Sequence, residues 1–500
     1  MVNFVLKEND SFQLNSVMKS YKYDQDKYIH PKATYANAFR ILKKYFPEKP
    51  FNLKELRSSD IISAFEFCDG FLTSRGKGAT IEQSKASGIM EYCERFSWLN
   101  FDYKNAPGYM LKSFNDLKNE VNLEGIDKVF YISYSKNKQK LYELAKDIPF
   151  HWVQGYSLTN NRYTLYPINW NNLYQSTNGL ASGNIKEETI LQGICEIIER
   201  HNSAEFINNL SNIHTEIIDK DSIENEVLRN LLNLLKKHNI DIHLINATLG
   251  LKVSTIIACG IDNNPEIELL RTGYGYGCHT DPQKAIIRAV TEYCLGRETV
   301  YSKKNPLHKL KLEKGQWQFK LNIDLDKILN TSKIISYKDL PDLSNDDIKE
   351  EIFNTVKLLK ENGFETIIID KTHPLIKIPV YRIFVPGIAP GTSISTFEQN
   401  EHFQMVLAYF QGGQKDIAQK YYEEHFSEIS QEFTSQLELL RPQELPIPID
   451  NLLSLFNPKT LPLEAFCRED FQEQLKLSMK AISGNQESIL EMISKMNKSK

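Results

Sequence analysis

Two near-copies of one phrase stand out in this chain: Gly88–Arg95 reads GIMEYCER, and Gly193–Arg200 reads GICEIIER. A fainter third copy, Thr291–Cys294 (TEYC), follows about as far downstream again. Each copy places acidic groups at helical spacing on an otherwise apolar segment. Clustered carboxylates repel each other unless something cationic lies between them. The phrase therefore predicts helices whose carboxylates interact with a cation and which pack through their apolar sides.

The bulk composition is that of an ordinary soluble protein. Of 500 residues, 41% are hydrophobic and 25% are charged, which is ample for a core. The formal net charge of −4 gives no global reason to expect nucleic-acid binding. The N-terminal stretch lacks a secretion signal, and no apolar run approaches the ~18 residues needed to span a bilayer. We expect a cytoplasmic protein without membrane contact.

The cysteines indicate a reducing compartment. The seven cysteines are scattered along the chain and form no C-x-x-C pair. This usage favours buried thiols over a disulfide framework or a zinc site.

Helical and strand patterns alternate up to about residue 390, which predicts an α/β or α+β fold. The predicted helices include Ile81–Trp98, Lys186–Ala204 and Pro282–Thr299. The predicted strands include Lys128–Ser133, Asp241–Ala247, Val253–Cys259, Thr366–Asp370 and Val380–Val385.

The last fifth of the chain has no strand pattern, so we divide the chain into a domain of residues 1–395 and an α-helical region of residues 396–500. Small turns at Gln411–Gly413 and Ser483–Asn485 each separate two helical segments. The turns lie about two periods of ~34 residues apart, which is typical of tetratricopeptide-like repeats. An unrelated helical tail is the alternative, and the pattern favours neither.

The second copy of the phrase shows the acidic stripe most fully. Glu188, Gln192, Glu196 and Glu199 lie along one side of a helix, and the opposite side is almost entirely apolar. So apolar a helix should be largely buried, and its carboxylates should then be buried too or face a cavity. The alternative is a solvated polar face on an amphipathic helix.

The other two helices repeat the arrangement. Ser87, Glu91 and Glu94 line one side of the first, and Arg288 and Glu292 share a face of the third. For the third, the alternative is a simple intrahelical ion pair. Three such stripes favour convergence on a pocket of about five or six carboxylates, which divalent cations would stabilise. Oxygen-rich sites favour magnesium, usually shared with substrate phosphates.

Glycine-rich segments precede all three helices: Ser74–Thr80 (SRGKGAT), Asn178–Asn184 (NGLASGN) and Gly273–His279 (GYGYGCH). We interpret the first as a turn in which Lys77 and backbone N–H groups at the helix start could bind phosphate. It is not a Walker A loop, and the third segment does not fit the dinucleotide fingerprint. An ordinary turn is the alternative for each.

Taken together, these segments resemble the YcaO family. The resemblance rests on Gly76–Ser97, Asn178–Arg200, Gly277–Arg297 and Val380–Gly387, in the right order over roughly residues 65–390. It implies an α/β fold that binds ATP without a P-loop and holds magnesium through glutamates from several helices.

The resemblance also implies residue roles, carried over position by position. The implied magnesium ligands and catalytic residues are Glu91, Glu94, Glu196 and Glu199, with Glu188 and Glu292 in support. The implied nucleotide contacts are Ser87, Asn184, Gln192, Arg200 and Arg288, beside Lys77 of the glycine-rich segment. Ala181 departs from members that have serine there, and Lys32 is a weak match to the family's N-terminal contacts.

The chemistry implied by the resemblance is activation of a peptide backbone amide. The amide oxygen attacks the γ-phosphate of ATP, and phosphate later leaves from the phosphorylated amide. Magnesium neutralises the transferring group, and positioning supplies most of the catalysis. The incoming nucleophile decides the product: a neighbouring side chain gives an azoline, sulfide a thioamide and an amine an amidine.

The sequence favours one branch of the family. Azoline-forming members end in a proline-rich tail, whereas this chain ends MNKSK and carries a C-terminal helical region, as stand-alone members do. We therefore expect thioamidation or an accessory role in modifying a small-subunit ribosomal protein. The alternatives are an azoline-forming cyclodehydratase and a non-catalytic ATP-binding scaffold. The expected partners are a peptide or protein substrate, a TfuA-like or ThiF-like protein, and a second copy in a homodimer.

Overall fold

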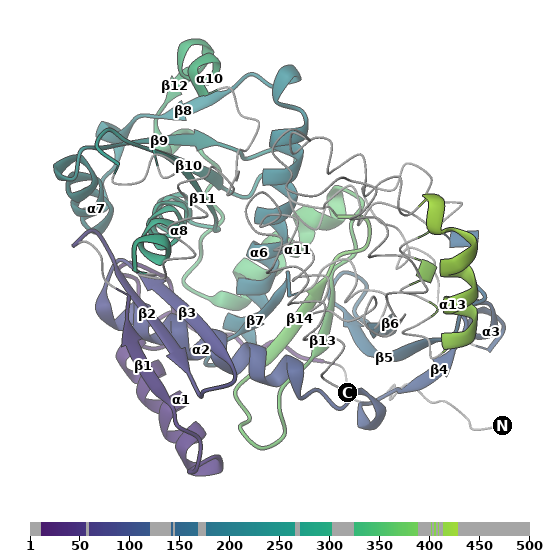
Figure 1. Ribbon diagram of the computed structural model, residues 1–500. Coiled ribbons are helices and arrows are strands. Elements are labelled where there is room, and N and C mark those ends of the chain that lie inside the picture. Colours follow the sequence, from purple (N-terminus) through teal and green to yellow (C-terminus); the bar gives the residue numbers. More distant parts are fainter. Residues whose placement is uncertain are drawn as a thin grey trace, which may run out of the picture.

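The computed structural model describes residues 12–56, 60–120, 142–143, 146–168, 177–265, 271–302, 325–388, 402, 405–406, 409 and 414–428. Within them lie three β-sheets with helices packed between and around them (Figure 1). The predicted strand Lys128–Ser133, the turn Ser483–Asn485 and the boundary at 395/396 lie outside these residues.

The first sheet is a three-stranded antiparallel meander with helices on one side. Its elements are α1 (Pro31–Tyr45), β1 (Asn52–Glu55), β2 (Ser63–Cys68), β3 (Thr73–Gly78) and α2 (Ile81–Leu99). Helix α2 packs on β2 and β3, and α1 packs on α2. Thr80 caps α2 by accepting a hydrogen bond from the N–H of Gln83 at 3.2 Å. The sheet therefore presents the first acidic helix directly after a strand.

The predicted glycine-rich turn before α2 is wrong, because Thr73–Gly78 is a strand. The glycines serve close packing instead. A Cβ added to Gly76 would lie 2.0 Å from the carbonyl oxygen of Ser84 and 2.2 Å from the nitrogen of Gly88, both in the backbone of α2. Only a residue without a side chain lets the strand and the helix approach so closely.

The second sheet has five strands in the order β11-β10-β9-β8-β12. Their bounds are β8 (Glu216–Ile218), β9 (Ile240–Asn246), β10 (Thr255–Asp262), β11 (Thr272–Cys278) and β12 (Lys333–Ile335). Helix α8 (Pro282–Ser302) covers β11 and β10, and α7 (Glu226–Lys237) covers β9. Many aliphatic side chains of these elements join one core cluster, while Ile245 and Ile257 belong to a second.

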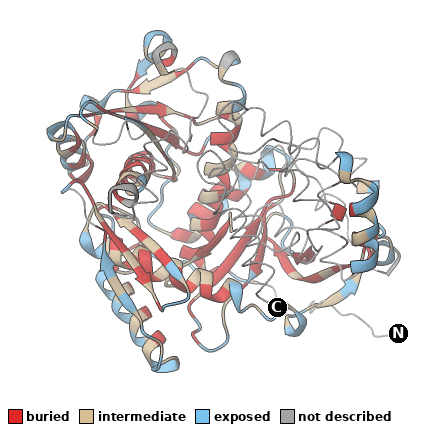
Figure 2. Ribbon diagram, in the orientation of Figure 1, coloured by how far each residue is buried: buried red, intermediate tan, exposed pale blue. Residues whose placement is uncertain are grey.

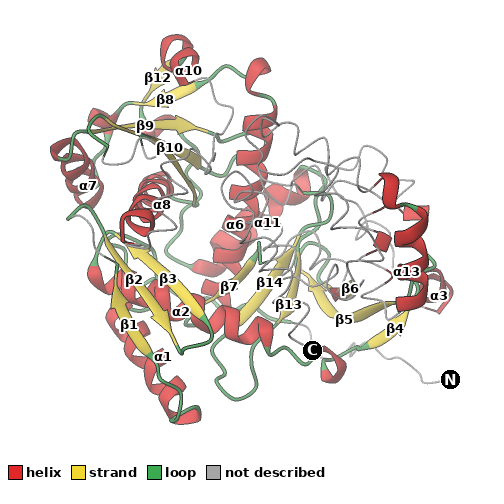
Figure 3. Cartoon of the chain, viewed as in Figure 1, coloured by secondary structure: helices red, strands yellow, loops and turns green. Residues whose placement is uncertain are grey.

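The segment GYGYGCH is also a strand and not a turn, since all but its last residue belong to β11. A Cβ on Gly277 would lie 2.3 Å from the carbonyl oxygen of Ala285 and 2.4 Å from the nitrogen of Ala289 in α8. The hairpin β10-β11 followed by α8 thus repeats the arrangement of β2-β3 followed by α2 (Figure 3). Both acidic helices are held tightly against a glycine-bearing strand.

The third sheet follows the order β4-β5-β13-β14-β7, with β6 paired to β5. Its strands are β4 (Met110–Lys112), β5 (Phe150–Ser157), β6 (Arg162–Pro167), β7 (Leu180–Ser182), β13 (Ile367–Asp370) and β14 (Val380–Phe384). Helix α6 (Lys186–Asn208) packs on β14 and β7 and also contacts β10 and β11, so it runs between two sheets (Figure 1). Helix α11 (Ile348–Glu361) packs beside it.

Burial follows this layering. The central strands and much of α6 are buried, whereas α1 and α13 (Lys415–Glu424) expose one side (Figure 2). The remaining described helices are short: α3 (Phe114–Glu120) and α10 (Leu325–Thr331). The predicted α/β class is confirmed, as are the helices α2, α6 and α8 and the strands β9, β10, β13 and β14. Helix α13 agrees with the predicted helix after Gln411–Gly413.

Asp69 links the first sheet to α2 through hydrogen bonds, and its replacement should lower the free energy of unfolding. Its buried carboxylate pairs with Lys49 and accepts hydrogen bonds from the Tyr92 hydroxyl at 2.8 Å and the Leu72 N–H at 2.7 Å. We expect Asp69→Asn to lower the free energy of unfolding by about 2–3 kcal/mol, since Lys49 and Tyr92 lose a charged acceptor. Chemical denaturation at neutral pH measures this, and Asp60→Asn on the exposed surface is the control.

The same variant should show a pH dependence. Burial raises the pKa of Asp69, but Lys49 and the surrounding donors outweigh it and bring that pKa to about 2. A carboxyl whose pKa is lowered by folding stabilises the protein above its unfolded value of 3.8 and loses this contribution as the pH falls toward 2. The difference between parent and Asp69→Asn should therefore shrink in acid. A difference that stays constant would contradict this account.

Candidate functional site

The three acidic helices meet where their sheets adjoin. Helix α8 contacts β3, α2 contacts β7, and α6 contacts β7 and β11. The Ser182 hydroxyl of β7 donates to the Met90 carbonyl of α2 at 2.8 Å, which fixes α2 against the third sheet. The acidic stripes of the three helices are thereby brought into one region.

Both carboxylates of α2 pair with Arg95, and one of them also accepts a backbone N–H. Glu91 accepts the N–H of Arg75 at 3.1 Å and pairs with Arg95 at 3.5 Å. Glu94 pairs with the same arginine at 3.7 Å. Burial raises the pKa of Glu94 well above its usual range, Arg95 opposes this, and the charges of Glu196 and Glu91 add to it. Glu94 therefore resists ionisation unless more positive charge approaches.

The carboxylates of α6 are arranged in the same way. Glu196 pairs with Arg200 at 3.9 Å, and Glu199 accepts the N–H of Cys278 at 3.1 Å. Burial raises the pKa of Glu196, Arg200 lowers it, and the charge of Glu199 raises it further. The charge of Glu196 on α6 raises the pKa of Glu94 on α2, so the two helices contribute to one acidic cluster.

Cationic side chains from β3 and α8 lie next to this acidic cluster. Lys77 pairs with Glu292, and the guanidinium of Arg288 donates to the Cys278 carbonyl at 3.1 Å. Burial lowers the pKa of Lys77 to about 8, with Glu199 opposing the shift and Arg288 and Arg200 reinforcing it. The three helices and β3 thus gather several carboxylates and several cationic side chains in one region.

Side chains of the cluster are partly exposed to solvent. The side chains of Glu91, Glu196 and Lys77 keep 35%, 24% and 27% of their surfaces exposed, although protein surrounds them. Among the described residues, no three His, Cys, Asp or Glu side chains form a group that could hold a metal ion. The predicted carboxylates therefore lie in one region, but they are partly exposed and pair with arginines.

A small pocket lies along α6 beside the cluster. It is lined by Lys19, Asp26, Lys27, Glu188, Leu191, Gln192, Cys195, His279, Arg288 and Ile348. Glu188 accepts hydrogen bonds from the Asn184 side chain at 3.0 Å and the Tyr28 N–H at 2.7 Å. Arg288 lines the pocket and also belongs to the cluster, so the two adjoin.

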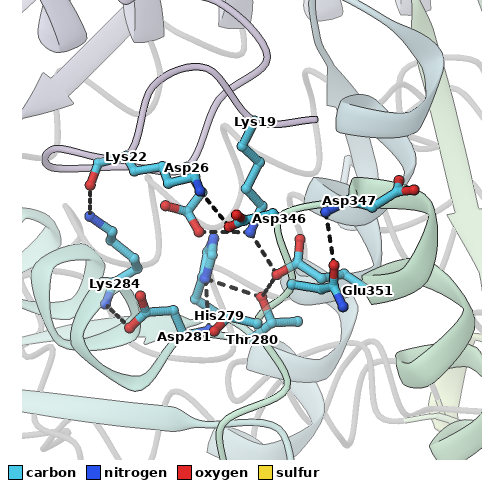
Figure 4. A network of polar contacts seen from close by, with 12 residues as sticks. Lys19, Lys22, Asp26, His279, Thr280, Asp281, Lys284, Asp346, Asp347 and Glu351 are labelled. Carbon is cyan, nitrogen blue, oxygen red and sulfur yellow. Dashed lines mark hydrogen bonds and ion pairs between the residues drawn. The ribbon is translucent and has the colours of Figure 1, made fainter. Parts of the chain in front are cut away.

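An N-terminal segment, residues 12–30, closes one side of the pocket. Lys19 is buried between Asp26 and Glu351, at 2.8 Å from each, and Thr280 donates to Glu351 at 2.7 Å (Figure 4). The Lys284 ammonium donates to the carbonyl of Lys22 at 2.8 Å. These contacts connect the segment to α8 and α11.

His279 lies in the same network and lines the pocket. Its Nδ1 accepts the N–H of Asp281 at 3.0 Å, so its proton is on Nε2 (Figure 4). Burial lowers the pKa of His279 well below its usual range, and Arg288, Lys19 and Lys27 add to this. His279 is therefore a neutral donor at physiological pH.

The structure brings most of the residues expected from the sequence into this region, and it adds residues of the N-terminal segment. Lys77, Glu91, Glu94, Glu196, Glu199, Arg200, Arg288 and Glu292 gather at the cluster, and Asn184, Glu188 and Gln192 at the pocket. Ser87 is half-buried on α2 and lies outside the pocket lining. Lys32 is exposed on α1, whereas Lys19 and Lys27 line the pocket. No sequence pattern marks those two lysines.

Lys19 should be essential for seating the N-terminal segment. We expect Lys19→Met to cost about 3 kcal/mol of unfolding free energy, because it leaves the buried Glu351 and Asp26 without their cation. The double variant Lys19→Met/Glu351→Gln should recover part of the loss. Lys22→Ala, which removes an exposed ion pair from the same segment, should change the denaturation midpoint little. Equal effects of Lys19→Met and Lys22→Ala would contradict the assignment.

Comparison with known families decides the identity of the fold. The family described as YcaO cyclodehydratase, ATP- and Mg²⁺-binding, matches residues 75–389. The chain belongs to the YcaO family. The matched residues run from β3 to the end of the third sheet and contain all three acidic helices. The YcaO family binds ATP and Mg²⁺.

Solved YcaO structures share this fold. A heterocyclase in complex with substrate and cofactor superposes with a TM-score of 0.60 at 22% identity, covering 76% of this chain and 55% of that one. The YcaO protein of Methanopyrus kandleri, bound with AMPPCP and Mg²⁺, gives 0.52 at 17% identity, covering 75% and 95%. At these identities the likeness shows the fold, and the predicted YcaO-type architecture is confirmed.

Two relatives have no assigned activity. An uncharacterised protein of Methanothermobacter thermautotrophicus is 26% identical over 328 residues, which are 63% of this chain and 80% of that one. An uncharacterised protein in the tfuA 3′ region of Rhizobium leguminosarum bv. trifolii is 23% identical over 235 residues. This chain spans about half the length of the Rhizobium protein and of the heterocyclase.

None of the described helices is both long enough and apolar enough to cross a bilayer.

Proposed function

We propose that this chain is an enzyme that uses ATP and Mg²⁺ to phosphorylate the oxygen of a peptide backbone amide. The observation that carries the proposal is the site in which carboxylates of α2 and α6 face the cations of β3 and α8 beside a pocket. Such a site suits a substrate that brings phosphates and divalent metal together. Membership of an ATP- and Mg²⁺-binding family supports the same function.

The donor atoms suit magnesium by type, although no three of these side chains form a metal-binding group among the residues that the structure describes. Glu91, Glu94, Glu196 and Glu199 offer oxygen atoms alone, and the raised pKa values of Glu94 and Glu196 are of the kind that an added cation would relieve. We assign these four glutamates as the ligands. Bound there, the metal would supply neutralisation of the transferring phosphoryl group.

The remaining residues fall into roles around the nucleotide. Lys77, Arg200 and Arg288 provide positive charge for phosphates, and Glu292 positions Lys77. Glu188 and Gln192 line the pocket, Asn184 donates to Glu188, and Glu188 also accepts the Tyr28 N–H of the N-terminal segment. Ser87 is retained as a nucleotide contact on α2. A neutral His279 offers a donor at the pocket wall without adding charge.

For the product, we favour thioamidation or an accessory role in modifying a ribosomal protein. The relative in the tfuA 3′ region of Rhizobium supports the first, because a TfuA-like partner would accompany sulfur transfer. We further propose a peptide or protein substrate and a homodimer.

Azoline formation by cyclodehydration is the second candidate. The observation in its favour is the shared fold with a heterocyclase, at a TM-score of 0.60. A ThiF-like partner would accompany that branch. A non-catalytic ATP-binding scaffold is the least favoured, since the full set of carboxylates and cations is present at the site.

Isotope transfer tests the amide activation whatever nucleophile follows. The purified chain is incubated with ATP, Mg²⁺, sulfide and candidate peptides whose backbone amides carry heavy oxygen; small-subunit ribosomal protein segments are one such set. Amide phosphorylation requires the label to appear in the released phosphate. Unlabelled phosphate with a modified peptide would overturn the proposal. Product mass then separates the branches: exchange of oxygen for sulfur raises it, and loss of water lowers it.

A further inference from the structure

Strand β3 has one edge that no other strand covers in the described part of the chain. It is the last strand of the first sheet, in the order β1-β2-β3. The N–H of Asp69 donates to the Leu72 carbonyl at 3.2 Å and closes the β2-β3 hairpin. From there, hydrogen-bonded and non-hydrogen-bonded pairs alternate along an antiparallel ladder. The main-chain N–H and carbonyl groups of Thr73, Arg75 and Lys77 therefore point away from β2.

One of these outward groups holds a carboxylate of the first acidic helix. The N–H of Arg75 donates to Oε2 of Glu91 on α2 at 3.1 Å. Helix α2 comes close enough because strand β3 has a glycine at position 76. A Cβ on Gly76 would lie 2.2 Å from the nitrogen of Gly88, which precedes Glu91 by about one turn of α2. The close strand–helix contact therefore brings the carboxylate within reach of the strand edge.

The last residue of β11 has the same role for α6. Strand β11 is the edge strand of the second sheet. The N–H of Cys278 donates to Oε2 of Glu199 at 3.1 Å, and its carbonyl accepts from Arg288 at 3.1 Å. Two carboxylates from different helices are thus each held, through one oxygen, by the main chain of an edge strand.

The other oxygen of Glu91 has a different kind of partner. The guanidinium of Arg95 lies 3.5 Å from its Oε1, and the arginine side chain is 28% exposed. A partly exposed arginine can rotate away from a carboxylate, whereas a main-chain N–H within a strand keeps its position. Oε2 of Glu91 is therefore the fixed oxygen, and Oε1 is the one that can exchange Arg95 for another cation.

We propose that the main-chain N–H groups of Arg75 and Cys278 are positioning groups, which orient Glu91 and Glu199 for Mg²⁺. The inference rests on the proposed function, which assigns these two glutamates as ligands. The positioning comes from the geometry of the strands and not from the side chains at the two positions. Hydrogen bonds to the ligands of a metal typically contribute about tenfold to a hundredfold to its affinity.

Proline substitution tests the Arg75 group, since proline lacks the N–H and an edge strand tolerates it where that N–H points outward. The full chain is titrated with Mg²⁺–AMPPCP. We expect Arg75→Pro to bind it about tenfold or more weakly than Arg75→Ala, which loses the same guanidinium but keeps the N–H. The matched control is Thr73→Pro on the same strand. The outward N–H of Thr73 has no partner among the described residues, so this variant should bind like the parent.

A second titration separates positioning from disruption of the strand. AMPPCP without metal, in the presence of EDTA, has phosphates that need the cations of the site but not its carboxylates. Positioning predicts equal affinities of Arg75→Pro and Arg75→Ala for metal-free AMPPCP. Displacement of β3 would move Lys77 as well and would weaken binding with and without metal.

The outcomes distinguish this inference from the proposed function. Equal binding of Mg²⁺–AMPPCP by Arg75→Pro and Arg75→Ala overturns the positioning role and leaves the proposed function standing. An equal loss with and without metal also overturns the positioning role. A parent chain that does not bind Mg²⁺–AMPPCP overturns the proposed function, and the positioning role with it.

Hydrogen exchange decides the matter if Arg75→Pro does not fold. The exchange rate of the Arg75 amide is compared in the parent and in Glu91→Ala, with the Thr73 amide as the reference. We expect the Arg75 amide alone to exchange faster in Glu91→Ala. Because coupling between two sites is reciprocal, Mg²⁺–AMPPCP should also slow this amide in the parent. An Arg75 amide that responds to neither change overturns the inference.

Discussion

Glu94→Gln is expected to lower Mg²⁺-dependent ATP turnover by about a hundredfold or more while leaving the fold intact. Glutamine keeps the size of the side chain and one acceptor oxygen, but it loses the charge that a metal ligand needs. The fold should tolerate it because burial already raises the pKa of Glu94, so the neutral form suits its surroundings. Glu199→Gln should behave alike, since its side-chain oxygen can still accept the N–H of Cys278.

The matched control lies on the same helix. Glu82 is exposed in the first turn of α2, so Glu82→Gln removes one negative charge outside the site. ATP hydrolysis with and without Mg²⁺ and the thermal unfolding midpoint are measured for all three variants. If Glu94→Gln and Glu199→Gln turn over ATP like the parent, the assignment of these glutamates as metal ligands is wrong. If their midpoints collapse, their role is structural.

Gly76→Ala should destabilise the protein by about 3 kcal/mol or more and disrupt the site as well. The new Cβ would fall 2.0 Å from the Ser84 carbonyl oxygen, and a backbone atom cannot rotate away as a side chain can. Strand β3 and helix α2 would have to separate, which displaces Lys77 from one element and Glu91 from the other.

Two other glycines make a graded series. A Cβ on Gly88, on the facing side of α2, would lie 3.3 Å from the Gly76 nitrogen, so Gly88→Ala should cost much less. Gly296 of α8 is exposed with nothing within 4 Å of a Cβ, and Gly296→Ala should stabilise the helix by roughly 0.5–1 kcal/mol. Urea unfolding ranks the three. A Gly76→Ala midpoint equal to that of Gly88→Ala would refute the close strand–helix contact.

The acidic helices were predictable because helical periodicity is a local property. The spacing of Glu188, Gln192, Glu196 and Glu199 places them on one side of α6 wherever that helix lies. Their shared binding of a cation stays a prediction from the sequence, made because three such stripes need a common cation. Which arginine each carboxylate pairs with could not be read from spacing, since Arg95 serves both Glu91 and Glu94.

The glycine-rich segments show where local reasoning fails. Glycine by itself favours turns, so RGKG and GYGYG were interpreted as loops that could hold phosphate. Both are strands, because neighbouring strands supply their hydrogen bonds and the glycines leave room for a helix. The requirement is set by packing between elements, and a lone sequence carries no trace of how closely two backbones approach.

By itself, the sequence determined the class of the fold, the three acidic helices and the chemistry that their carboxylates favour, since each follows from residue type and spacing along one element. Tertiary structure alone decided that Lys19 lies between Asp26 and Glu351 and that the glycine segments are strands. Those contacts join residues far apart in the chain, and burial and packing between separate elements create them.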